Sequence, residues 1–361
     1  MKILHLGKYY PQENGGIEQV TQDLAIEQAK QELDVRVLAF TRLKSTTQTL
    51  EDVSVERCKI FAEVASQPLS LLYVLKGMKF IQDCDVVHIH YPNFVAAFIA
   101  LFAPKSTCIV VHWHCDVIDK KFLKFFVLWI QNMLLRKSDA IVVTSEGYLS
   151  ASLDLRPFTQ KIEVIPIGLQ DNSTELKITK NRNQVLFVGR LVDYKAVDML
   201  ISALTEIDQD FVAYIVGDGP NRARLEQRLE AEKDQRIVMK GRVDDDELRA
   251  LYDSSAIFCL PSNNRSEAFG VVLLEAMRSK CATVTAEIPG SGVPWVNKHG
   301  LLFKNNDYKD LKSQIIRLLN DDELASSIGE KGRERFLLNF TLRESTNQIM
   351  SLYRKILLER K

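Results

Sequence analysis

The chain repeats one pattern along its length: a short, almost entirely apolar segment is followed by a longer amphipathic one. Apolar runs of about four to eight residues are typical of strands buried on both faces, and the longer segments have the period of helices. Strands that alternate with helices form a parallel sheet, because each helix carries the chain back to the edge where the next strand starts. The pattern therefore predicts an α/β chain built from doubly wound, Rossmann-like sheets.

The pattern occurs twice, on either side of a polar stretch at 170–183. In the first half, strands are expected at Lys2–Leu6, Val35–Phe40, Val86–His90, Cys108–Val111, Ala140–Thr144 and Ile162–Ile165. Helices are expected there at Val20–Gln31, Leu69–Gln82, Phe94–Phe102 and Lys121–Arg136. Because 361 residues exceed the ~250–300 at which a single core stops growing, two domains are expected.

In the second half, strands are expected at Gln184–Val188, Val212–Val216, Ile237–Lys240, Ala256–Leu260 and Ala282–Thr285. The helices are expected at Ala196–Leu204, Arg222–Lys233, Asp245–Asp253, Phe269–Ser279, Tyr308–Asn320, Asp322–Phe336 and Leu342–Arg360. We predict a first domain over 1–168, a second over 169–340 and a final helix over 341–361. The carboxyl ends of the two sheets would border a cleft, since open α/β sheets bind ligands at those ends.

The composition excludes several classes of protein. Lysine plus arginine equals aspartate plus glutamate, 47 of each, whereas a nucleic-acid-binding protein would show a basic excess. The six cysteines form no Cys-x-x-Cys pair, which favours core thiols in a reducing compartment over disulfides or a zinc site. The N-terminus does not resemble a signal peptide, and no apolar run reaches the ~18 residues of a membrane span. These features predict a cytoplasmic protein.

Neither half carries the glycine fingerprint of a dinucleotide-binding site after its first strand. The first half has Gly7 followed later by Gly15-Gly16, and the second has Gly189-Arg190. No Gly-Lys-Ser/Thr of a phosphate-binding P-loop occurs either. A nicotinamide oxidoreductase and a P-loop nucleotide hydrolase are therefore disfavoured.

Two carboxylates eight positions apart, Glu267 and Glu275, flank the expected start of a helix near Gly270. The amino end of a helix offers free N–H groups and a partial positive charge, which suit a phosphate. A carboxylate before the helix can accept hydrogen bonds from sugar hydroxyls, and one on its second turn can do so from ribose. Alternatively, both are solvated surface residues.

Arg190 and Lys195 follow the first strand of the second domain. They could neutralise a diphosphate that becomes a leaving group; otherwise they are two surface bases in a turn. Gly15-Gly16 follows the first strand of the first domain, where paired glycines let the backbone approach a ligand closely.

Four histidines lie near the ends of two expected strands: His88 and His90 on one, His112 and His114 on the other. A metal site is conceivable, but two such pairs without a supporting carboxylate set are a weak indication of zinc. We interpret His5 and His88 as structural residues and His114 as a polar contact of the substrate.

Residues 120–137 form an expected helix that is apolar nearly all round and basic at both ends. Such a helix is either buried or lies in the interface of a bilayer, where the basic residues suit anionic headgroups. Both readings stay open, and the second predicts peripheral contact with the cytoplasmic face of an inner membrane.

Taken together, these motifs resemble those of the retaining glycosyltransferases of family 4, which have the two-domain GT-B fold. The resemblance covers nearly the whole chain and is carried by Gly15-Gly16, His114, Gly189-Arg190, Lys195, Gly217-Asp218-Gly219-Pro220, Pro261-Ser262 and the segment 266–276. His112-Trp113-His114-Cys115-Asp116 is similar to bacterial members that build surface polysaccharides such as lipopolysaccharide or capsule. The last helix resembles the one that crosses back to the first domain in this family.

The resemblance implies a reaction that transfers a hexose from a nucleoside-diphosphate sugar to a saccharide, with a lipid-linked acceptor and no metal or other cofactor. It implies that Arg190 and Lys195 neutralise the donor diphosphate and that Glu275 binds the ribose. Residues implied in contacting the transferred sugar or phosphate are Gly16, His114, Glu267, Phe269 and Gly270, the last two through their backbone. One departure is Ala196, where the family usually has glycine; a helical alanine is expected to be compatible.

Two alternatives remain for the same fold. A sugar-nucleotide epimerase or hydrolase would release nucleotide without an acceptor. A non-catalytic partner subunit would lose the side chains at Arg190, Lys195, Glu267 or Glu275, all of which are present here.

Overall fold

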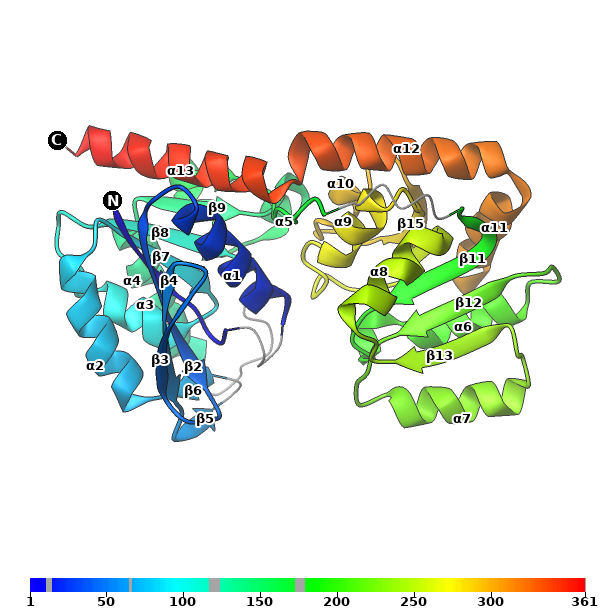
Figure 1. Ribbon diagram of the computed structural model, residues 1–361, viewed down its shortest axis with the longest axis horizontal. Helices are drawn as coiled ribbons and strands as arrows, with labels where there is room; N and C mark the ends of the chain where they lie inside the picture. The colour runs from blue at the N-terminus through cyan, green and yellow to red at the C-terminus, as the bar shows by residue number, and fades with distance from the viewer. Residues whose placement is uncertain (11–14, 65–66, 117–123, 173–178, 361) are drawn as a thin grey trace. The chain divides into compact units, whose positions relative to one another are not determined.

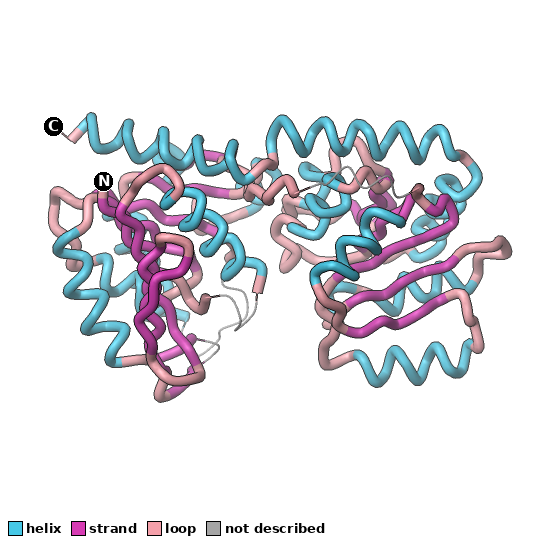
Figure 2. Tube along the Cα trace, in the orientation of Figure 1, coloured by secondary structure: helices cyan, strands magenta, loops and turns pink. Residues whose placement is uncertain are grey.

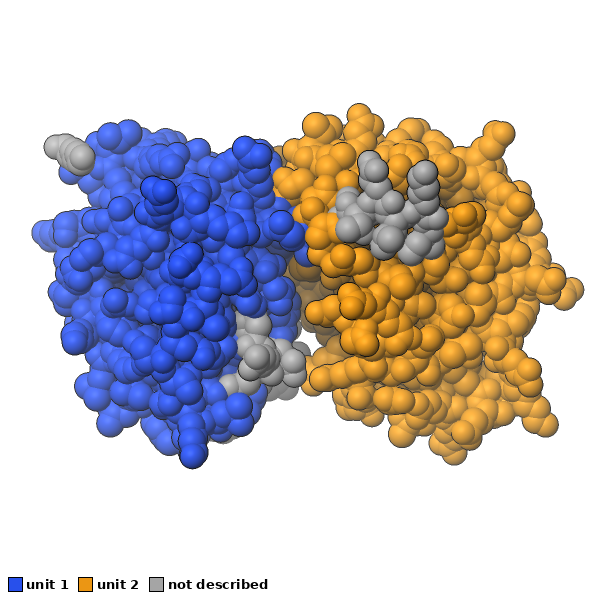
Figure 3. All heavy atoms as spheres, in the orientation of Figure 1, with its two compact units in different colours: residues 1–144, 152–170, 342–361 blue, residues 145–151, 171–341 orange. Residues whose placement is uncertain are grey.

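The computed structural model describes residues 1–10, 15–64, 67–116, 124–172 and 179–360. It divides into two compact units, coloured separately in Figure 3. The first comprises Met1–Thr144, Ser152–Gln170 and Leu342–Lys361, and the second Ser145–Ala151 and Asp171–Thr341. The predicted domain 1–168 includes the short helix α5 (Glu146–Ala151), which belongs to the second unit; the sequence pattern does not indicate this.

The first unit contains a sheet with the strand order β10-β9-β8-β7-β1-β2-β4-β3 (Figures 1 and 2). Its strands are β1 (Lys2–Leu6), β2 (Asp34–Thr41), β3 (Thr46–Leu50), β4 (Val53–Lys59), β7 (Val86–Tyr91), β8 (Cys108–Trp113), β9 (Ala140–Val143) and β10 (Ile162–Val164). All neighbours are parallel except the hairpin of β3 and β4. A small hairpin of β5 (Ala62–Val64) and β6 (Gln67–Leu69) accompanies it.

Helices cover both faces of this sheet, as the right-handed crossover rule requires. They are α1 (Gly16–Ala29), α2 (Leu71–Phe80), η1 (Ile81–Asp83), α3 (Phe94–Ala100), α4 (Lys124–Lys137), η2 (Arg156–Lys161) and α13 (Leu342–Glu359). The chain runs along the sheet in one direction through α1 and in the other through α2, α3 and α4, which places α1 on the opposite face. Helix α13 packs beside α1, and its residues Ile349, Tyr353 and Ile356 join the core under the sheet.

The second unit has a six-stranded, fully parallel sheet in the order β13-β12-β11-β14-β15-β16. The strands are β11 (Asn181–Val188), β12 (Val212–Val216), β13 (Ile237–Gly241), β14 (Ser255–Leu260), β15 (Ala282–Glu287) and β16 (Leu301–Lys304). The helices are η3 (Asp193–Lys195), α6 (Val197–Thr205), α7 (Arg222–Glu232), α8 (Asp245–Ser254), α9 (Val271–Arg278), α10 (Val293–Val296), α11 (Tyr308–Asn320) and α12 (Asp322–Asn339). Both units therefore have the predicted α/β class.

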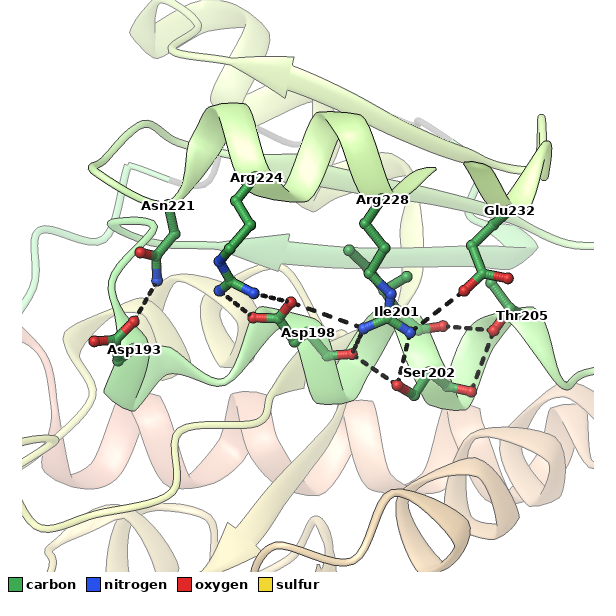
Figure 4. A network of polar contacts seen from close by, with 9 residues as sticks. All are labelled: Asp193, Asp198, Ile201, Ser202, Thr205, Asn221, Arg224, Arg228 and Glu232. Atoms are coloured by element: carbon green, nitrogen blue, oxygen red, sulfur yellow. Dashed lines mark hydrogen bonds and ion pairs between the residues drawn. The ribbon is translucent and has the colours of Figure 1, made fainter. Parts of the chain in front are cut away.

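Side chains at the start of α7 and along it form hydrogen bonds and ion pairs with the segment that carries Lys195. Arg224 of α7 donates to both carboxylate oxygens of Asp198, at 2.7 and 2.6 Å. Figure 4 shows this pair and its neighbours. Arg228 donates to the carbonyl of Asp198 and to Ser202, and Asn221 Nδ2 donates to Asp193 Oδ1 at 2.8 Å. Exposed pairs add little one by one, but a two-pronged guanidinium contact fixes orientation. The network therefore holds η3 and the start of α6 in one position.

None of the helices in the described part of the chain is long and apolar enough to cross a membrane.

Candidate functional site

The second unit brings two of the predicted site residues into direct contact. Lys195 Nζ lies 2.5 Å from Glu267 Oε2, and both side chains are about nine-tenths buried, at 9% and 10% exposure. The hydroxyl of buried Ser262 donates to the same carboxylate oxygen at 2.7 Å. An ion pair shielded from water interacts more strongly than a surface pair, but its desolvation is costly. A cation and an anion are thus held together at the carboxyl ends of β11 and β14.

Two glycine-containing turns, after β11 and after β12, lie close together near this pair. A Cβ on Gly217, whose φ is +130°, would lie 2.0 Å from the carbonyl oxygen of Gly189, and one on Gly219 would overlap the backbone of Leu191. Gly189 N also donates to Val216 O, and Leu191 N to Asp218 O. The Lys195 amine would be only 3.6 Å from a Cβ on Gly189. The glycines of the two turns therefore let the loops approach closely enough to position Lys195.

The start of α9 is fixed by the loop after β15. Gly270 caps the helix with φ +79°, a left-handed conformation that glycine adopts without strain. The Ser291 hydroxyl donates to the carbonyl of Glu267, and Gly292 N donates to that of Ala268 at 2.8 Å. Phe269 packs its buried ring edge-on against Phe340, so only its backbone is available for binding.

Glu275 lies on the second turn of α9, as predicted. The buried Tyr252 of α8 donates a hydrogen bond to Glu275 Oε2 at 2.6 Å. Burial raises the pKa of Glu275, and the hydrogen bond from Tyr252 opposes that shift. Tyr252 thus orients the carboxylate. No sequence signal pointed to this tyrosine, because it lies in a different helix.

Arg190 and Ala196 flank Lys195 and behave differently. Arg190 is exposed, and its guanidinium has no hydrogen-bond or ion-pair partner among the residues that the structure describes. It is therefore free to bind an anion. Ala196 has φ +49° and ψ +38°, so the expectation of a helical alanine is wrong. A left-handed alanine costs about 1–2 kcal/mol that glycine avoids, which gives a physical reason for the glycine that the resemblance leads one to expect.

In the first unit, α1 begins at Gly16, earlier than the predicted Val20. Gly16 is exposed, and an added Cβ would meet no atom of the described residues within 4 Å. Gly15 precedes it with φ +158° and packs against the carboxylate of Glu18. Desolvation raises the pKa of Glu18.

The histidines of the first unit gather on one face of its sheet. His5, His88, His90, His112 and His114 are all buried. Strand β8 continues past the predicted Val111 to Trp113, just before His114. His112 and His114 stack with their ring centroids 4.2 Å apart, so they project to the same side. Burial lowers the pKa of His5 to about 4 and that of His114 to about 3. These imidazoles are therefore neutral near pH 7.

Two groups of these histidines have ligand atoms close enough to hold a metal ion: His5, His88 and His90, and His90, His112 and His114. However, His5 Nδ1 lies 3.1 Å from His90 Nε2, and His90 Nδ1 lies 3.1 Å from His114 Nε2. Each of these pairs has hydrogen-bond geometry, which needs a proton on one nitrogen. We interpret the cluster as a hydrogen-bond network. That the protein requires no metal stays a prediction.

Comparison with known proteins agrees with this architecture. Residues 14–172 match the family described as Glycosyltransferase Family 4, and residues 170–335 match Glycosyl transferases group 1. O-antigen chain mannosyltransferase C of Escherichia coli is 30% identical over 99% of both chains. D-rhamnosyltransferase WbpZ of Pseudomonas aeruginosa is 29% identical over 94% of this chain and 92% of its own.

Solved structures show the same fold. Anabaena HepE in complex with UDP superposes with a TM-score of 0.80 at 19% identity, over 98% of this chain and 100% of HepE. Sucrose-phosphate synthase of Thermosynechococcus elongatus gives a TM-score of 0.78 at 18% identity, over 99% of this chain and 100% of that enzyme. The chain is a glycosyltransferase with the GT-B fold. It belongs to glycosyltransferase family 4, and its relatives include enzymes of bacterial surface polysaccharides.

Proposed function

We propose that this enzyme transfers a sugar from a nucleoside-diphosphate sugar to a saccharide acceptor and retains the anomeric configuration. The acceptor is a lipid-linked saccharide of bacterial surface polysaccharide synthesis. Two relatives support this choice, since one is named for the O-antigen chain and the other for D-rhamnose transfer. HepE, which shares the fold, is bound to UDP and to UDP-glucose in its structures.

The observation that carries the proposal is the buried contact of Lys195 with Glu267, together with the exposed Arg190 of the same loop, which has no partner among the residues that the structure describes. A sugar diphosphate offers both of the groups that this arrangement can bind. Its phosphates attract the guanidinium and the amine, and its sugar hydroxyls donate to the carboxylate. Glu275, held by Tyr252, would accept from the ribose hydroxyls.

In the proposed reaction the acceptor hydroxyl attacks the anomeric carbon from the face that the diphosphate leaves. The bond from that carbon to the phosphate oxygen breaks, and a leaving phosphate oxygen takes the proton of the hydroxyl. Arg190 and Lys195 stabilise the charge that develops on the diphosphate, without a metal ion. The backbone of Phe269 and Gly270 and the side chain of His114 position the sugar, while Gly16 approaches the phosphate or the acceptor.

A panel of nucleoside-diphosphate sugars, scored by thermal shift, tests donor binding. A ligand at one hundred times its Kd should stabilise the protein by about 2.7 kcal/mol, which raises Tm by several degrees. We expect one nucleotide to do so, and Glu275→Ala to lose most of the shift. A panel in which no nucleotide raises Tm, or a Glu275→Ala enzyme that transfers sugar at the parental rate, would contradict the assignment.

We also propose that the first unit contacts an anionic membrane from the cytoplasmic side. Helix α4 exposes Trp129 and Met133, its neighbour α3 exposes Phe98, and α2 next to it exposes Leu71 and Leu75. These three helices contain no aspartate or glutamate but have five basic residues. One of these, Lys76 of α2, is paired with Glu56 of β4. Apolar side chains among basic residues suit an anionic lipid interface. Lys120 and Lys121, also part of the predicted segment, lie outside the described residues.

Vesicle co-sedimentation tests this contact. With phosphatidylglycerol vesicles, we expect the double variant Trp129→Glu, Phe98→Glu to lower the bound fraction about tenfold, because it places carboxylates in the lipid interface. The control is Leu338→Glu on α12 of the second unit, an exposed leucine whose substitution should leave binding unchanged. Equal sedimentation of all three proteins, or a pellet without vesicles that indicates self-association, would contradict the membrane proposal.

A further inference from the structure

Five of the six histidines of the chain belong to one buried network, and the sequence gives no reason for so many in one place. They form two hydrogen-bonded rows across β1, β7 and the end of β8. One row runs from Gln28 of α1 through His5 and His90 to His114. The other runs from Tyr353 of α13 through His88 to His112.

The first row has a fixed direction, because the Gln28 atom that faces His5 is the amide oxygen, which can only accept. Gln28 Oε1 lies 2.7 Å from His5 Nε2, so that nitrogen carries the proton. A neutral imidazole has one N–H, so His5 Nδ1 is an acceptor and must receive its hydrogen bond from His90 Nε2 at 3.1 Å. The same argument makes His90 Nδ1 the acceptor of a hydrogen bond from His114 Nε2, also at 3.1 Å.

The row therefore ends on a lone pair at His114 Nδ1. This atom is buried and has no hydrogen-bond partner in the described structure. The side chain keeps 5% exposure, so it lies just below the surface at the carboxyl end of β8. A buried acceptor without a donor is destabilising, and a ligand hydroxyl that donates to it removes that cost.

We propose that Gln28, through His5 and His90, fixes the tautomer of His114 so that Nδ1 accepts a hydrogen bond from a hydroxyl of the transferred sugar. This inference rests on the proposed sugar contact of His114. Gln28, His5 and His90 are positioning residues, because they act through His114. The second row starts at Tyr353, whose hydroxyl can both donate and accept, and we assign a polarity to the first row alone.

The surroundings keep this arrangement unchanged over the working range of pH. Burial lowers the pKa of His5, His90 and His114, and the interacting charges at His90 are those of the other imidazoles of the cluster. His114 thus remains an acceptor, and its low basicity suits it to orienting a hydroxyl better than to abstracting a proton.

Nitrogen-15 NMR of the histidine-labelled whole protein tests the polarity without relying on turnover. With six histidines, each ring can be assigned by comparing single variants. We expect His5, His90 and His114 to carry their proton on Nε2 in the free enzyme. A proton on His114 Nδ1 would overturn the inference, even in a protein that binds donor and transfers sugar. Conversely, a failed donor panel would reject the proposed function and leave this readout intact.

Two substitutions of Gln28 test its role. Gln28→Met has a similar volume but no acceptor oxygen, so His114 should show both tautomers and kcat/KM for sugar transfer should fall about tenfold. Gln28→Glu still presents an acceptor to His5 and should retain the single tautomer. Overturning results are a His114 tautomer in Gln28→Met identical to that of the parent, or a loss of kcat/KM with no change of tautomer.

Discussion

Replacement of Lys195 by methionine should lower kcat/KM for sugar transfer by about 10²–10³-fold. The methionine keeps most of the side-chain volume but removes the cation that we assign to the departing diphosphate, and the loss of one such stabilising group has an effect of this size. The same change leaves Glu267 buried without its partner, which should also lower the free energy of unfolding by about 3–5 kcal/mol. Steady-state kinetics and urea denaturation measure the two effects.

A second variant separates catalysis from stability. In Lys195→Met, Glu267→Gln the buried charge is gone, while an amide in place of the carboxylate can still bond to Ser262. We expect this protein to recover most of the lost stability but none of the transfer activity. Recovery of activity together with stability would show that the ion pair serves only the fold.

Acid should destabilise the first unit strongly, beginning below about pH 6.5. Histidine in an unfolded chain has a pKa of about 6.5, whereas burial lowers the pKa of His5 and His114 to about 4 and about 3, and that of His88, His90 and His112 well below the usual value. Above about pH 6.5 the histidines are neutral in both the folded and the unfolded chain, and the free energy of unfolding has its full value. It falls as pH decreases, because the unfolded chain binds protons that the folded one does not.

The expected size is large. At one pH unit below 6.5, each such histidine lowers the free energy of unfolding by about 1.4 kcal/mol. The cluster therefore lowers it by up to ~7 kcal/mol, which equals the whole free energy of unfolding of many domains. Glu18 and Asp23 of the same unit have a raised pKa because of desolvation, so they act in the opposite direction, and only near the pH range of carboxyl groups. Urea denaturation at pH 7.5, 6.5 and 5.5 measures the loss.

Single variants identify the source of this acid sensitivity. His112→Asn should reduce the proton uptake on unfolding by about one proton, since it removes one buried ring. His299→Gln should change it less, because His299 is exposed in the second unit. If unfolding of the wild-type protein takes up one proton or fewer at pH values between 6.5 and 5.5, the histidines of the cluster are not buried in their neutral form.

Much of the fold was predictable from the sequence because parallel strands buried on both faces leave continuous apolar runs. All such strands of the two predicted sets were found near their expected positions, from β1 to β15. The hairpin of β3 and β4 was missed. Strand β3, with the sequence Thr-Thr-Gln-Thr-Leu, lies at the sheet edge with mostly exposed side chains, so it lacks the apolar run. Strand β16 was also missed: it is only four residues long, and of its apolar residues only Phe303 is buried.

The site was predictable where residues adjoin in sequence, and less so where separate elements meet. The spacing of Glu267 and Glu275 around Gly270 placed the helix start correctly within two residues. The contact of Lys195 with Glu267 joins segments that lie far apart in the chain, so only the fold brings them together. The left-handed Ala196 could not be read from helical periodicity, because its backbone is set by the turn that presents Lys195.

Calorimetric titration of the nucleoside diphosphate that gives the largest thermal shift tests the central claim most directly, using wild-type enzyme and Arg190→Ala. Arg190 is exposed, so its removal should leave Tm unchanged and isolate its effect on binding. We predict saturable binding to wild type and an increase in Kd of at least about tenfold in the variant, which corresponds to the loss of one charge-assisted contact. The same Kd for both proteins would contradict a cationic site for the leaving diphosphate in the second unit.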